Sequence, residues 1–124
     1  MTEESKETRY DAAIALKEAG DSEHAMEQLE KLCEDFPDYA LPHAALSMLY
    51  CRFGAFEDSL KHATRVCELE PQDPFSFTAL SSLAIKSGNH ELAEAALSKA
   101  RNIQAEYFNS ENADKSESAD KTED

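Results

Sequence analysis

The sequence predicts an all-α protein made of repeated pairs of helices. Gly20, Gly54 and Gly88 are evenly spaced, and the stretches between them carry apolar residues at helical spacing. The chain holds only three glycines and four prolines among 124 residues, too few for the turns that many short strands would need. A fixed period of this kind indicates a repeat architecture. Three units of equal length are therefore expected, at residues 6–39, 40–73 and 74–107.

The first unit is expected to form two helices, over about residues 6–18 and 22–33. In both stretches apolar residues recur every three or four residues, which places them on one face of a helix. Gly20 ends the first of these helices, and the carboxylate of Asp21 caps the second by accepting from free backbone N–H groups. Pro37 then stops the second helix and turns the chain.

The second unit repeats this plan with one weaker turn. Its first helix is expected to start at a cap near Asp38, with Pro42 in the first turn, where a missing N–H is harmless. In the turn between its two helices, Ala55 stands where the other units carry Asp21 and Asn89. Because alanine offers no side-chain acceptor, we expect this turn to be the least well capped of the three.

The third unit opens with Asp73 and Pro74, a cap residue followed by a proline suited to the first helical position. Its second helix differs from the earlier ones, because Ala105 stands where they carry a proline. With no residue to stop it, this helix is expected to continue through Tyr107 and Phe108.

Both ends of the chain are polar. Residues 1–5 are expected to be frayed, and residues 108–124 to form a disordered acidic tail that cannot bury enough apolar surface to order itself. The formal net charge is −14 and is uneven, since the first unit carries −6 and the third unit zero. This charge disfavours nucleic acid and anionic membranes as partners. It favours a partner of basic character, which would be attracted first to the N-terminal end.

Cys33, Cys51 and Cys67 are odd in number and form no C-x-x-C pair, so neither a disulfide framework nor a zinc site is predicted. Cys33 and Cys67 occupy equivalent places on the apolar faces of successive units, and we interpret them as small buried hydrophobes. The N-terminus lacks the features of a signal peptide, and the longest apolar run, residues 44–51, is too short to span a membrane. A cytoplasmic protein is therefore expected.

No motif for catalysis or cofactor binding is visible in the sequence. The four histidines lie at different places in their units and form no i, i+4 pair, so no metal site is expected. The chain also lacks a glycine-rich phosphate loop, a nucleophile elbow and an H-E-x-x-H motif. We therefore expect neither a cofactor nor enzymatic activity.

Small side chains recur where the two helices of each unit would cross. The expected pairs are Ala13 with Ala25, Ser47 with Ser59, and Ser81 with Ala93. Small residues on both sides let two helix axes approach closely. Together with the repeat period and Phe56 at the start of the middle unit's second helix, these pairs resemble the tetratricopeptide repeat (TPR) family, over residues 6–107.

The resemblance implies a right-handed α-solenoid of six helices, in which the first helix of each pair lines a concave face. Members of the family bind extended peptides or helices of other proteins on that face. One subclass clamps a C-terminal carboxylate there with lysine, asparagine and arginine. The matching positions in this chain are Tyr10, Ile14, Ala45, Phe75 and Ala79, so a carboxylate clamp is excluded.

Carried over onto this chain, the concave face is an apolar groove with a flexible thioether and two aromatic rings, suited to an amphipathic helix or an apolar peptide. The competing interpretation is that its side chains pack on their own neighbours, or that Tyr107 and Phe108 fold back over them. The residues of the face are Tyr10, Ile14, Lys17, Leu41, Ala44, Ala45, Met48, Arg52, Phe75, Thr78, Ala79, Ser82 and Lys86.

These features predict a non-catalytic adaptor or scaffold that binds another protein through its concave face. One alternative is a unit that self-associates into a homo-oligomer through its uncapped last pair. Another is a small chaperone that holds an apolar client segment.

Overall fold

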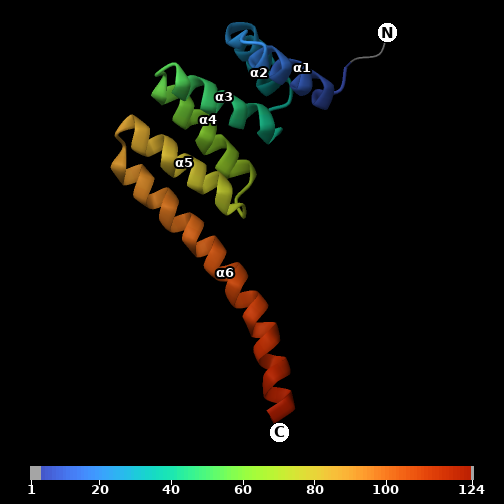
Figure 1. The fold of residues 1–124 in the computed structure, drawn as a ribbon, viewed down its shortest axis with the longest axis vertical. Coiled ribbons are helices and arrows are strands. Elements are labelled where there is room, and N and C mark those ends of the chain that lie inside the picture. Colours follow the sequence, from blue (N-terminus) through green and yellow to red (C-terminus); the bar gives the residue numbers. More distant parts are fainter. Residues whose placement is uncertain (1–3, 124) are drawn as a thin grey trace.

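The structure, a computed structural model, describes the backbone of residues 4–123 and the side chains of residues 4–111. Every regular element in this part of the chain is an α-helix, and consecutive helices pack side by side in a stack of pairs (Figure 1). The helices are α1 (Lys6–Glu18), α2 (Ser22–Asp35), α3 (Ala40–Arg52), α4 (Phe56–Leu69), α5 (Pro74–Ser87) and α6 (His90–Glu123). They form the three helix pairs that the sequence period predicts.

A glycine makes the turn inside each pair possible. The three turn glycines have φ between 79° and 90°, in the left-handed region that residues with a Cβ rarely adopt. After the first and third of these turns, Asp21 and Asn89 accept hydrogen bonds from backbone N–H groups three residues on. Ala55 provides no side-chain cap to α4, which confirms that the middle turn is the least well capped of the three.

The helix crossings carry the small residues that the sequence predicts there. All six of these side chains are buried, and Ala13 and Ala25 are fully excluded from solvent. Two of the serines add a hydrogen bond between helices. The hydroxyl of Ser59 donates to the carbonyl of Ser47 over 2.7 Å, and that of Ser81 donates to the carbonyl of Ala93 on α6 over 2.8 Å. Close approach in the second and third pairs is therefore reinforced by a buried hydrogen bond.

The start of α3 differs from the sequence-based expectation. Tyr39, not Asp38, precedes the helix, and no side chain caps it. The carboxylate of Asp38 pairs instead with Arg65 of α4 over 3.0 Å, so it is directed at the next helix rather than at the N-terminus of α3. Pro42 lies in the first turn as expected, where it is buried.

Two clusters of buried apolar side chains join the pairs. The first links the first pair to α3 and comprises Ala13, Leu29, Leu32, Leu46 and Leu49. The second links α4 to the third pair and comprises Ala63, Cys67, Leu80, Leu83 and Ala96. Full burial of one leucine side chain contributes roughly 1.5–3 kcal/mol. The four leucines of the first cluster are therefore a main source of cohesion between the first and second pairs.

Helix α6 runs beyond the boundary predicted for the repeat domain. Ile103 is its last buried residue among those whose side chains are described, and residues 104–111 are all exposed. The structure continues the helix to Glu123, whereas the sequence led us to expect a disordered tail from residue 108 (Figure 1). The chain after Gly88 contains no glycine or proline that would stop a helix, and this is the physical reason for the continuous element.

The N-terminal end is also more regular than expected. The hydroxyl of Ser5 accepts from the N–H of Thr8 over 3.1 Å and caps α1, so Ser5 belongs to the folded part and not to a frayed end. Residues 1–3 of the expected frayed segment lie outside the described residues. Among the helices described, none combines the length and the apolar character needed to cross a membrane.

Candidate functional site

Two hollows lie between α3 and α5, the first helices of the second and third pairs, and side chains of α4 contribute to the lining of both. The first, of about 220 Å³, is lined in part by Ala44, Phe75 and Ala79. The second, of about 430 Å³, is lined in part by Met48, Arg52 and Lys86. All six residues belong to the concave face predicted from the sequence. We call the two hollows together the α3–α5 groove.

The groove presents large apolar side chains to solvent. Phe75 is 75% exposed and Met48 is 58% exposed. Leu41 lies outside the two hollows, two helical turns before Met48 on α3, and is 47% exposed. Apolar exposure gathered on one face is typical of an interaction surface. The competing interpretation, in which these side chains are covered by their own neighbours, does not hold for Phe75 and Met48.

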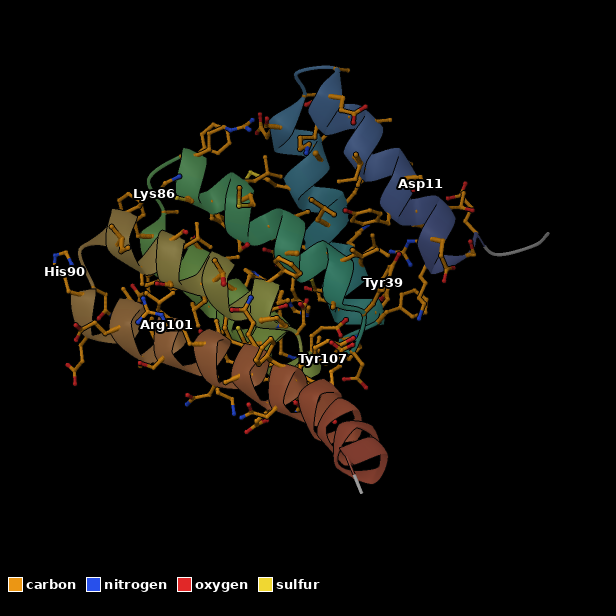
Figure 2. All side chains as sticks on the ribbon, turned by 60° about the horizontal axis from the view of Figure 1, so that its bottom comes forward. Asp11, Tyr39, Lys86, His90, Arg101 and Tyr107 are labelled. Atoms are coloured by element: carbon orange, nitrogen blue, oxygen red, sulfur yellow. The ribbon has the colours of Figure 1, made fainter. Side chains whose placement is uncertain are left out.

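Positive charge gathers at one end of the groove. Arg52 is the last residue of α3, and Lys86 lies in the last turn of α5, at the edge of the stack (Figure 2). Among the described residues neither side chain forms an ion pair, so both charges are available to a ligand. The groove therefore combines apolar walls with a cationic end.

The other predicted residues lie outside the two hollows. Tyr10 and Ala45 pack against the first core cluster, so their side chains support the fold. The ring of Tyr10 meets that of Tyr39 edge to face at 6.1 Å between centroids, and burial raises the pKa of its hydroxyl. The remaining residues are half-buried or exposed on α1, α3 and α5, and they are Ile14, Lys17, Leu41, Thr78 and Ser82.

A further hollow lies on the free side of the last pair. It measures about 790 Å³ and extends from Pro74, at the start of α5, along the exposed part of α6. Tyr107 (Figure 2) and Phe108 line it and are 68% and 63% exposed. Neither residue lines the hollows of the α3–α5 groove, so they do not fold back over it. We call this hollow the α6 surface.

A cluster of polar side chains lies between the first and second pairs, and the sequence reasoning missed it. Cys33 of α2, His43 of α3 and His62 of α4 each place one ligand atom within 4.8 Å of the others. The Nδ1 atoms of the two histidines are 3.0 Å apart, and the Sγ of Cys33 is 3.6 Å from Nδ1 of His43. Spacing along the chain was a poor guide here, because packing between different helices brings these residues together.

Two more groups complete this cluster. The Oε1 atom of Glu30 lies 3.4 Å from Nε2 of His62 and also accepts from the hydroxyl of Tyr50. The ring of Tyr50 stacks on that of His62 with centroids 5.7 Å apart. Burial lowers the pKa of both histidines, and it raises the pKa of the Cys33 thiol to about 12. All three side chains are therefore mainly uncharged near neutral pH.

Comparison with solved structures identifies the fold. Neither a protein-family model nor a curated protein sequence matches the chain. Two structures of MamA align with it at TM-scores of 0.76 and 0.77 and 15% identity, over 85% of this chain and 61% and 57% of theirs. YrrB, described as a TPR protein with an unusual peptide-binding site, aligns at a TM-score of 0.71 and 20% identity, over 91% of this chain and 58% of its own.

These similarities show that the chain has the TPR fold, an all-α solenoid of three helix pairs. The chain spans about three fifths of the length of the proteins it matches. Identities of 15% and 20% show the fold alone and carry no information about a function or a partner.

Proposed function

We propose that the protein is a non-catalytic interaction module that binds an apolar segment of another protein in the α3–α5 groove. The observation that carries the proposal is the exposure of Met48 and Phe75 beside two hollows on one face of the stack. Covering an apolar side chain of this size contributes roughly 1.5–3 kcal/mol. A partner that covers both residues therefore gains a driving force located at this groove. The peptide-binding site named for YrrB offers a parallel within the same fold.

The lining of the groove describes the segment that would fit. The small side chains of Ala44 and Ala79 leave room, and the thioether of Met48 adapts to different shapes, which suits an amphipathic helix or an extended apolar peptide. Arg52 and Lys86 favour an acidic group at one end of that segment. The negative charge of the whole chain favours basic character elsewhere on the partner.

A test of the groove needs a peptide ligand, which can be obtained by selecting a random displayed peptide library against the full chain. We expect the selected peptides to be apolar, and we expect Met48→Asp to weaken their binding about tenfold or more, because a carboxylate replaces apolar burial of roughly 1.5–3 kcal/mol. Calorimetric titration measures the dissociation constants, and circular dichroism verifies that each variant is folded.

Ile85→Asp is the matched control for that experiment. Ile85 is 57% exposed on α5 but lines neither hollow of the groove, so the same change there should leave the affinity unchanged. An equal loss in both variants, or no loss in Met48→Asp, would contradict the groove assignment.

A second candidate function is self-association through the α6 surface. Tyr107 and Phe108 are exposed beside a hollow of about 790 Å³ that lies between the start of α5 and the exposed part of α6. In sedimentation equilibrium we expect concentration-dependent dimers that the double variant Tyr107→Asp, Phe108→Asp abolishes. A strict monomer at high protein concentration would eliminate this candidate.

The proposal also places the protein in the cytoplasm. Cys33, Cys51 and Cys67 are all free thiols. A reducing compartment keeps such thiols free. Localisation of a tagged full chain by fractionation tests this assignment.

A further inference from the structure

The polar cluster between the first two helix pairs has the composition of a transition-metal site. Cys33, His43 and His62 come from three different helices, and their ligand atoms all lie within 4.8 Å of one another. Thiolate sulfur and imidazole nitrogen are preferred ligands of zinc in proteins. His43 is buried and the other two residues are half-buried, so packing holds these side chains in place.

Contacts at Nε2 orient the two imidazole rings. The Nε2 atom of His43 lies 3.3 Å from the carbonyl oxygen of Pro37, which only accepts, so this Nε2 carries the proton and Nδ1 keeps a lone pair. The Nε2 atom of His62 lies 3.4 Å from the carboxylate of Glu30. With a proton on each Nε2, both Nδ1 atoms present the lone pair with which a histidine binds a metal.

The Nδ1 atoms of the two histidines lie 3.0 Å apart, and the Sγ of Cys33 lies 3.6 Å from Nδ1 of His43. In the metal-free chain one Nδ1 donates a hydrogen bond to the other, so the buried polar atoms of the cluster are paired. A metal ion that displaces this proton binds both nitrogens at once.

Two of the three distances within the cluster are close to the edges of a zinc coordination tetrahedron. Zinc binds nitrogen at about 2.0–2.1 Å and sulfur at about 2.3 Å, so tetrahedral geometry separates two nitrogens by about 3.3 Å and a nitrogen from a sulfur by about 3.6 Å. In the structure the two nitrogens are 3.0 Å apart and the sulfur is 3.6 Å from Nδ1 of His43. The third distance, between the sulfur and the ligand nitrogen of His62, is within 4.8 Å, so side-chain movement has to complete the tetrahedron around the ion.

We propose that Cys33, His43 and His62 bind a Zn²⁺ ion that joins the first helix pair to the second. The carbonyl of Pro37 and the carboxylate of Glu30 orient the two ligand rings, as outer partners of histidine ligands do in zinc proteins. A water molecule supplies the fourth ligand from an open cavity of about 580 Å³ that both histidines line. This site is independent of the function proposed for the α3–α5 groove.

The charges around the site accommodate the ion. Cys33 binds zinc as a thiolate, and its proton leaves to solvent. The ion and the thiolate together leave one positive charge, which the nearby carboxylate of Glu30 balances. Arg65 lines the same cavity, but its guanidinium is paired with Asp38 at 3.0 Å and Glu68 at 3.4 Å.

Titration of the reduced, metal-free full chain with Co²⁺ tests the proposal. We expect a thiolate-to-cobalt charge-transfer band together with the d–d bands of tetrahedral cobalt, saturating at one equivalent per chain and disappearing when Zn²⁺ is added. Cys33→Ser should abolish the charge-transfer band, because the thiolate is lost. His62→Ala should abolish the d–d bands of tetrahedral cobalt. The third pair carries Ala96 at the place of His62, so alanine suits this position of the repeat.

Cys67→Ser is the matched control, because Cys67 stands one repeat further along the chain at the place of Cys33. It should bind cobalt as the wild type does. The proposal is overturned if the wild type shows no charge-transfer band, or if the band survives in Cys33→Ser and is lost in Cys67→Ser.

X-ray absorption at the zinc edge gives a measurement that needs no variant. The zinc-loaded wild-type chain should show one sulfur at about 2.3 Å and nitrogen or oxygen ligands at about 2.0–2.1 Å. A shell without sulfur would overturn the assignment of Cys33 as a ligand.

Discussion

The two interfaces between successive helix pairs share a backbone plan and differ in chemistry. Because the three units have the same length, each residue of the first interface has a counterpart in the second, one repeat further along the chain. The first interface carries Glu30, Cys33, His43, Tyr50 and His62. Their counterparts in the second are Thr64, Cys67, Phe77, Ala84 and Ala96. Of these five positions, only the cysteine carries the same residue in both interfaces.

The same cysteine position therefore has two environments. Cys67 is 5% exposed within an apolar cluster, and Phe77 packs against that cluster. The Sγ of Cys33 instead lies 3.6 Å from a histidine nitrogen, so this residue is not simply the small buried hydrophobe that the sequence indicated. Among the described side chains, every buried polar atom has a hydrogen-bond partner. The stack thus contains one polar and one apolar interface, and the buried polar groups of the first are paired.

The largest effect is expected when a residue of the first interface is moved into the second. Phe77→His in the metal-free chain replaces an aromatic ring in an apolar cluster with an imidazole whose neighbours include no counterpart of Glu30. The free energy of unfolding, measured by urea denaturation, should fall by about 3 kcal/mol, through lost burial and an unpaired polar group. The reverse change, His43→Phe, should cost less, because His62 keeps its contact with Glu30. Equal costs would contradict the difference between the interfaces.

Zinc should stabilise the first interface and not the second. At a free zinc concentration about 100 times the dissociation constant, binding to the folded chain adds about 2.7 kcal/mol to the free energy of unfolding. A chelator should reverse the gain. Thermal or urea unfolding of His62→Ala provides the comparison, and a zinc-dependent gain of the same size in this variant would disprove stabilisation through the cluster.

Acidification should weaken the first interface selectively. Burial holds the pKa of His43 and of His62 below the ordinary value of 6.5, so the unfolded chain takes up protons more readily than the folded chain as the pH falls below that value. Their contribution to stability is complete above pH 6.5 and is lost as the pH falls toward the folded-state pKa values. His24 acts in the opposite sense, because the carboxylate of Asp21 raises its pKa.

Urea midpoints measured at neutral pH and at about pH 5 test this behaviour. The double variant His43→Phe, His62→Ala, which carries the residues of the second interface, should show a weaker pH dependence than the wild type. If stability depends on pH equally in both chains, groups other than His43 and His62 control that dependence.

The smallest effect concerns the turn of α3 and α4, the pair that contributes to both interfaces. Ala55→Asp should supply the missing cap of α4 and add about 1 kcal/mol, which raises the melting temperature by roughly 4–8 °C for a domain of this size. Asp21→Ala, at the corresponding position of the first pair, should lower stability by a similar amount. An unchanged melting temperature for Ala55→Asp would refute the capping argument.

The sequence by itself determined the repeat, the helix pairs, the glycine turns and the residues at the helix crossings. All of these depend on residues that are close in the chain or separated by one repeat. Pro37 ends a helix, Asp21 caps one and Ala55 fails to cap one through interactions with their own segment. Such local physics can be predicted without knowing how the pairs pack.

Only the tertiary structure decided which side chains meet across the interfaces. It gathers six of the predicted concave-face residues beside two hollows and turns Tyr10 and Ala45 toward the core, which depends on how each helix is rotated in the stack. It also brings together His43 and His62, which are 19 residues apart, on neighbouring helices. Their counterparts Phe77 and Ala96 belong to one apolar cluster at the second interface, so the same positions are used in both interfaces. Spacing within one helix could not reveal the site, because it is formed between helices.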